Sequence, residues 1–100
     1  MKKTSQDDIQ QALFRVMHPE IDYSLVDLGM LRDIAFKEKE VTVTLKLPFL
    51  GVPIKDYLIQ LVERAVKDVD KTIKVRINIK EMSSQERQEF MKKAKEGWKL

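Results

Sequence analysis

Side chains that could do acid–base or nucleophilic chemistry gather in one stretch of the chain, from His18 to Asp33. It holds the only histidine and four carboxylates: Glu20, Asp22, Asp27 and Asp33. Two paired carboxylates can act as general acid and base, and a histidine beside a serine can activate a nucleophile. The spacing of these carboxylates specifies no such pair, and Ser24 does not lie in a G-x-S-x-G turn. We therefore expect no catalytic residues and a protein that is not an enzyme.

The absence of cysteine limits the chemistry further. The 100-residue chain has no cysteine, so it forms no disulfide, no thiol nucleophile and no cysteine-ligated zinc or iron–sulfur centre. With a single histidine, we expect no metal site and no cofactor bound by this chain alone. The net charge of +3 permits an acidic partner without requiring a nucleic acid.

Two turns are the candidate binding elements. In the first, Asp27 stands two residues before Gly29, a spacing at which its side chain can cap a tight turn with Gly29 at positive φ. The alternative is that Asp27 points into a binding site.

The second turn is the loop from Pro48 to Pro53, between a strand and a helix. Gly51 and Val52 sit where a partner or an anion could approach the backbone at a helix N-terminus. Phe49 and Leu50 are unusual loop residues unless something covers them. The simpler alternative, which we favour at this point, is that they fill the end of the core.

Periodicity predicts six elements around these turns. A helix begins near Gln6 with a Ser5/Asp8 capping box and ends at His18, before Pro19. Strands cover 31–36 and 41–47, joined by a polar turn that we expect to be longer than two residues because it lacks Gly and Asn. Pro53 suits the first turn of the next helix, a third strand covers 73–79, and a capping box at 83–86 opens a final helix over 83–98.

This order, α-β-β-α-β-α, predicts one domain over residues 1–100, with a core from 5 to 82 and a C-terminal helix. The fold class is α/β (α+β): a two-layer sandwich with a three-stranded mixed sheet and helices on one face. The pattern leaves the strand order open. The other sheet face would carry Lys46, Lys74, Arg76 and Lys80, and we favour a solvated face over a phosphate-binding one because no aromatic residue accompanies them.

The motif residues resemble the MIP18 family, also called the DUF59 domain. Pro19-Glu20-Ile21 followed by Val26-Asp27-Leu28-Gly29-Met30-Leu31-Arg32-Asp33-Ile34 is similar to the D-P-E-I and V-D-L-G-L-[VI]-x-D-I elements of that family, with His18 in place of the first Asp. The resemblance covers roughly Ile9 to Lys80, and the final helix is similar to the extension that follows this domain in Mrp/ApbC-type proteins.

The resemblance implies an iron–sulfur cluster assembly or maturation factor that works with assembly components such as SUF proteins or a P-loop ATPase. It also implies a functional rim at Asp27, Gly29, Gly51 and Pro53. Many members carry a Cys in a T-P-x-C-P loop, and Val52 stands at that position here. We therefore expect an accessory protein that acts through protein–protein contacts and does not ligate the cluster.

Two other functions stay open at this point. The first is a small RNA- or nucleic-acid-binding module, because α-β-β-α-β with a basic sheet face resembles small RNA-binding folds; the mild charge and the lack of a G-x-x-G clamp weigh against it. The second is a small hydrolase, which lacks a nucleophile–base set. We see no signal peptide or membrane segment and expect a cytoplasmic protein. The oligomeric state is open, a homodimer included.

Overall fold

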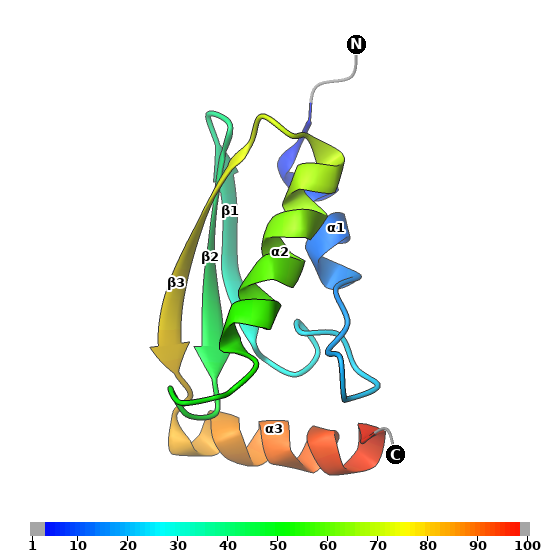
Figure 1. Cartoon of the computed structure of the whole chain (residues 1–100), viewed down its shortest axis with the longest axis vertical. Coiled ribbons are helices and arrows are strands. Elements are labelled where there is room, and N and C mark those ends of the chain that lie inside the picture. The colour runs from blue at the N-terminus through cyan, green and yellow to red at the C-terminus, as the bar shows by residue number, and fades with distance from the viewer. Residues whose placement is uncertain (1–3, 99–100) are drawn as a thin grey trace.

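The computed structural model describes residues 4–98, so the predicted domain ends at 1–3 and 99–100 lie outside the described part (Figure 1). The elements are α1 (Gln6–Phe14), β1 (Leu31–Lys37), β2 (Glu40–Leu47), α2 (Lys55–Val69), β3 (Lys74–Glu81) and α3 (Ser84–Gly97). Within the described range, no helix has both the length and the apolar character that crossing a membrane requires.

The sheet is three-stranded and mixed, as the sequence predicts. Its order is β1-β2-β3, with β1 and β2 antiparallel and β2 and β3 parallel. Helices α1 and α2 lie side by side on one face, whereas α3 crosses one end of the sandwich (Figure 1). The expectation that the helices share one face therefore holds for two of the three.

The core lies between β2 and the first two helices. The alternating residues Val41, Val43, Leu45 and Leu47 of β2 are fully buried, because β2 is the central strand and the helices cover this face. Each such side chain contributes roughly 1.5–3 kcal/mol when it leaves water. The helices supply Ile9, Leu13, Leu58, Val62 and Val66, all with no exposed surface.

A β-bulge in β1 resolves an inconsistency in the apolar pattern of that strand. Leu31 and Ile34 are three residues apart, so a regular strand would place them on opposite faces. The pairing register shifts between Arg32 and Ala35, and Asp33 takes the left-handed conformation with φ of 54°. The extra residue restores the alternation, so that Leu31 is buried and Ile34 packs against the core.

The turn between β1 and β2 differs from the prediction. Lys37 pairs with Glu40, so the turn contains two residues, Glu38 and Lys39, at φ of 51° and 63°. Positive φ at both positions is the type I′ geometry, whereas the lack of Gly and Asn led us to expect a longer turn. Contacts from other elements support it: the Lys74 N–H donates to the Lys39 carbonyl at 2.9 Å, and the Lys39 ammonium reaches Asp70 at 2.8 Å.

Two helix boundaries also differ from the prediction. Helix α1 ends at Phe14, four residues before His18, because the following segment leaves the helix to pair with residues 23–25. Helix α2 has Ile54 as its N-cap, so Pro53 precedes the helix rather than forming its first turn. The two predicted capping boxes, at Ser5/Asp8 and Ser83/Glu86, are both present.

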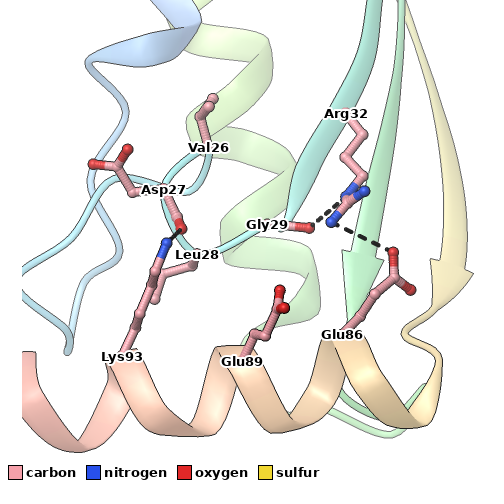
Figure 2. A pocket seen from close by; sticks show the side chains of 8 residues that line it. All are labelled: Val26, Asp27, Leu28, Gly29, Arg32, Glu86, Glu89 and Lys93. Atoms are coloured by element: carbon pink, nitrogen blue, oxygen red, sulfur yellow. Dashed lines mark hydrogen bonds and ion pairs between the residues drawn. The ribbon is translucent and has the colours of Figure 1, made fainter.

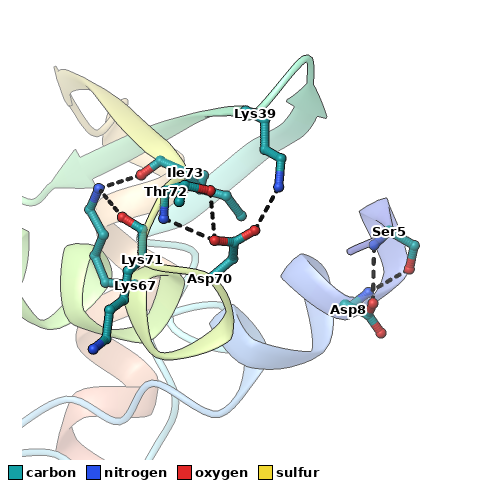
Figure 3. A network of polar contacts seen from close by, with 8 residues as sticks. All are labelled: Ser5, Asp8, Lys39, Lys67, Asp70, Lys71, Thr72 and Ile73. Carbon is teal, nitrogen blue, oxygen red and sulfur yellow. Dashed lines mark hydrogen bonds and ion pairs between the residues drawn. The ribbon is translucent and has the colours of Figure 1, made fainter. Parts of the chain in front are cut away.

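A polar network fixes the connection from α2 to β3 (Figure 3). The Asp70 carboxylate accepts hydrogen bonds from the Thr72 N–H and hydroxyl and from Lys39. The Lys39 and Thr72 hydrogen bonds hold the pKa of Asp70 well below its usual value. The Lys67 ammonium donates to the carbonyls of Lys71 and Ile73, which lie just beyond the end of its helix.

Candidate functional site

The segment between α1 and β1 is folded back on the core. Ile21, Leu25, Leu28 and Met30 are all buried. The Leu25 N–H donates to the Val16 carbonyl at 2.9 Å, and Met17 and Ser24 form an antiparallel bridge.

The residues of the P-E-I element lie in this segment. His18 is 5% exposed, and its Nδ1 accepts a hydrogen bond from the Glu20 N–H at 3.0 Å. His18 therefore belongs to the folded loop and not to a helix C-terminus. Pro19 and Glu20 are exposed.

The turn that carries Asp27 and Gly29 is capped by Ser24 instead of Asp27. The Ser24 hydroxyl accepts a hydrogen bond from the Asp27 N–H at 3.0 Å, and the Gly29 N–H donates to the Val26 carbonyl. Gly29 has φ of 76°, as expected for the tight turn. The Asp27 side chain is exposed and is not the cap of the turn.

A cavity of about 240 Å³ lies between this turn and α3 (Figure 2). The turn contributes Val26, Asp27, Leu28 and Gly29, β1 contributes Arg32, and α3 contributes Glu86, Glu89 and Lys93. The Lys93 ammonium donates to the Asp27 carbonyl at 2.7 Å, which ties the turn to the helix. The cavity is thus lined by charges of both signs.

Glu86 is the electrostatic centre of this cavity wall. Its carboxylate receives Lys46 at 2.7 Å, Arg32 at 3.5 Å and the Ser83 N–H at 2.8 Å. The Lys46 ammonium and the Ser83 N–H lower the pKa of Glu86 to about 2. The Arg32 guanidinium also donates to the Gly29 carbonyl at 3.3 Å, so it links the turn to α3.

The second candidate loop is partly anchored and partly exposed. The Pro48 carbonyl accepts a hydrogen bond from the Arg87 guanidinium at 2.7 Å, and Val52 packs against the core. Phe49 and Leu50 are 54% and 55% exposed, so they do not fill the end of the core, and the simpler interpretation of this loop is wrong.

Gly51 lies in open space. A Cβ added there would meet nothing within 4 Å, and its φ is outside the left-handed region. The fold itself therefore does not require glycine at this position.

Both turns lie at the end of the sandwich that α3 crosses (Figure 1). Each is bonded to α3, the loop through Arg87 and the first turn through Lys93. These residues are six positions apart, roughly 9 Å along the helix axis. Residues of the first turn and of α3 line the cavity, but residues 49–53 do not. The two turns therefore do not share a cleft, and α3 is the element that bonds to both.

The sequence alone did not identify the α3 side of this region. Glu86 stands out only as a helix-capping residue, and Glu89 and Lys93 of α3 look like ordinary surface charges in a linear pattern, as does Arg32 of β1. Asp33, in contrast, was identified by the motif, and the structure shows it at the bulge of β1.

No group of three or more His, Cys, Asp or Glu side chains among residues 4–98 is placed to hold a metal ion.

Comparison with known proteins identifies the family. The family model of the iron–sulfur cluster assembly protein matches residues 6–79. An iron–sulfur cluster carrier protein of Mycobacterium bovis is 35% identical over 85 residues, which are 84% of this chain and 22% of that protein. A carrier of the same name from Synechocystis is 33% identical over 73 residues, 73% of this chain and 21% of the relative. The chain thus spans about a fifth of the length of these carriers.

A relative of similar size is the Fe-S protein maturation auxiliary factor YitW of Bacillus subtilis, which is 26% identical over 80 residues, 79% of this chain and 78% of that protein. The fold matches a DUF59 domain of Bacillus anthracis (TM-score 0.68, 17% identity, 87% of this chain and 89% of that one) and a conserved hypothetical protein of Thermotoga maritima (TM-score 0.66, 23% identity, 90% and 97%). The chain therefore belongs to the iron–sulfur cluster assembly protein family, the DUF59/MIP18-like group that its motif predicts.

Proposed function

We propose that this domain is an accessory factor of iron–sulfur cluster assembly, which contacts assembly partners through its loops and does not itself ligate the cluster. The observation that carries the proposal is the family match over residues 6–79 in a chain that contains no cysteine. Thiolates are the usual ligands of iron–sulfur clusters, and Val52 offers only an apolar side chain at the position where many members of the MIP18 family resemble one another in carrying a Cys.

The contact surface in this proposal is the loop with Phe49, Leu50, Gly51, Val52 and Pro53, together with Asp27 and Gly29 of the first turn. Phe49 and Leu50 support it because two adjacent apolar side chains, each more than half exposed, are typical of an interface anchor. The Arg87 bond to the Pro48 carbonyl holds the base of the loop, so the two side chains are presented from a fixed point. The assembly partners that we propose for this surface are cluster scaffold proteins and carrier ATPases.

Cluster ligation is tested by anaerobic reconstitution of the purified chain with iron and sulfide. The expected result is that no iron–sulfur absorption co-elutes with the protein on gel filtration. Stoichiometric iron and sulfide retained on the wild-type chain would overturn the statement on ligation.

The contact surface is tested by binding of a recombinant cluster scaffold protein and a carrier ATPase, measured by calorimetry. Leu50→Asp should weaken binding of at least one of them by about tenfold or more, since an interface anchor is lost and a charge is placed at its position. The matched control is Val69→Asp, because Val69 is 37% exposed at the opposite end of α2 and should leave binding unchanged. The proposed surface would be contradicted if both variants weakened binding equally, or if neither variant weakened it.

A further inference from the structure

The two outer edges of the sheet differ in how their backbone groups are satisfied. At the β1 edge, the Gln6 side-chain amide acts as a substitute strand: it donates to the Ile34 carbonyl at 2.9 Å and accepts from the Phe36 N–H at 2.7 Å. At the other edge, no strand among residues 4–98 pairs with the outer side of β3. This edge faces away from both packed helices (Figure 1).

The backbone groups on that outer side can be assigned to particular residues. At the two ends of the β2–β3 ladder, the Lys74 N–H donates to the Lys39 carbonyl and the Met82 N–H to the Leu47 carbonyl. The direction of backbone groups alternates along a strand, so even-numbered residues of β3 face β2. The N–H and C=O groups of Val75, Ile77 and Ile79 therefore point outward, where an added strand would find them.

The side chains of β3 give this edge two different faces. Val75, Ile77 and Ile79 lie on the core face but are only partly buried, whereas their β2 neighbours Val41, Val43 and Leu45 are completely buried. The apolar row of the sheet is thus incompletely covered at its last strand. A further strand with apolar residues at alternate positions would extend that row and cover it.

The opposite face of the same strand is cationic. Lys74, Arg76 and Lys80 alternate with the apolar residues and are exposed. The register places them on one face with Lys37 and Lys46; Glu40 is the carboxylate at a paired position of that face, and Glu86 of α3 reaches Lys46 at 2.7 Å. Arg76 reaches Glu40 at 3.7 Å in a pair whose arginine side chain is 69% exposed, so the guanidinium can change partner readily.

We propose that the outer edge of β3 binds an extended segment of a partner protein, whose alternating acidic and apolar residues add a fourth strand to the sheet. The partner's carboxylates would lie across from Lys74, Arg76 and Lys80, and its apolar side chains would cover Ile77 and Ile79. The inference concerns a surface outside the rim used for the proposed function, and it does not depend on that function.

Two other occupants fit these residues less well. A second copy of this chain, paired β3 to β3 in antiparallel orientation, would place the cationic row against itself, and like charges directly opposite one another are destabilising. Single-stranded nucleic acid would meet the cations but would find no aromatic side chain to stack on and no use for the outward peptide groups. Charge and backbone together therefore favour an acidic peptide strand.

The test uses the full chain and a fluorescent peptide of about seven residues that alternates glutamate and valine. A peptide with lysine in place of glutamate, and one of equal composition with its glutamates and valines in separate blocks, are the controls. The expected result is that the acidic alternating peptide binds measurably and that neither control peptide does. Binding should slow hydrogen exchange at the amides of Val75, Ile77 and Ile79, because these amides gain partners.

Two variants separate backbone from charge. Ile77→Pro removes an outward N–H without removing a bond to β2, and it should abolish binding while the chain stays folded. Arg76→Glu combined with Lys80→Glu should weaken the acidic peptide by about tenfold or more and make the lysine peptide the better ligand. If the proline variant unfolds, the preference of the charge-reversed chain for the acidic or the lysine peptide still tests the proposal.

Several results would overturn the proposal. Equal binding of the block peptide would show that charge alone is sensed, and stronger binding of poly(U) RNA would identify a nucleic-acid surface. Slowed exchange confined to other segments would place the peptide elsewhere. A β3-paired dimer in sedimentation experiments at the assay concentration would assign the edge to a second copy.

Discussion

Position 33 offers a sharp test of how β1 is built. Asp33 has φ of 54°, a conformation that costs an ordinary L-residue about 1–2 kcal/mol and a β-branched residue more, whereas glycine adopts it freely. Asp33→Gly should therefore leave the free energy of unfolding within about 1 kcal/mol of wild type, because glycine's greater chain entropy offsets the relief of strain. Asp33→Val should lower it by about 2 kcal/mol.

The matched control is the same pair of substitutions at Ala35, two residues further along β1. Ala35 is exposed and is not among the residues at positive φ, so ordinary strand preferences apply there. Given those strand preferences, the free energy of unfolding of Ala35→Val should exceed that of Ala35→Gly by about 1 kcal/mol. The order of valine and glycine is therefore expected to reverse between positions 33 and 35.

The assay is urea unfolding followed by circular dichroism, with thermal midpoints as a check. A difference of about 2 kcal/mol between the two variants at position 33 corresponds to roughly 8–16 °C in a domain of this size. The reasoning fails if valine equals or exceeds glycine at position 33. It also fails if the two positions give the same order, because the bulge would then not require a left-handed residue.

Three further outcomes follow from the geometry. Glu38→Asn, which keeps the Lys39 ammonium on Asp70, should raise the free energy of unfolding by up to about 1 kcal/mol in urea titrations, since position 38 has positive φ; a loss of stability would contradict the type I′ assignment. Glu86→Gln should make the free energy of unfolding less dependent on pH in the acid range. As pH falls from 4.5 towards about 2, the unfolded carboxylate takes up its proton before the folded one, so wild type loses stability in this window; unfolding midpoints at pH 5 and pH 3 that shift equally in both proteins would refute this. Gly97→Ala should lower the thermal midpoint, because its Cβ would lie 2.8 Å from the Tyr23 ring; a midpoint equal to wild type would show that the ring moves away freely.

Local signals in the sequence were sufficient for much of the fold. Period-two and helical apolar patterns determined the order of the six elements, because burial of one face imposes those periods on any strand or helix. The two capping boxes determined where α1 and α3 begin, since these side chains bond to backbone groups only three residues away. The V-D-L-G motif also determined the family, which the match over residues 6–79 confirms.

Other features depend on contacts between distant segments, which a linear pattern does not contain. The two-residue turn at Glu38 and Lys39 is supported by Lys74 and Asp70, more than 30 residues away. The position of α3 across the end of the sheet decided that Glu86 and Lys93 face the first turn, although neither is close to it in sequence. The exposure of Phe49 and Leu50 was decided in the same way, because a loop side chain is buried only if another element lies over it.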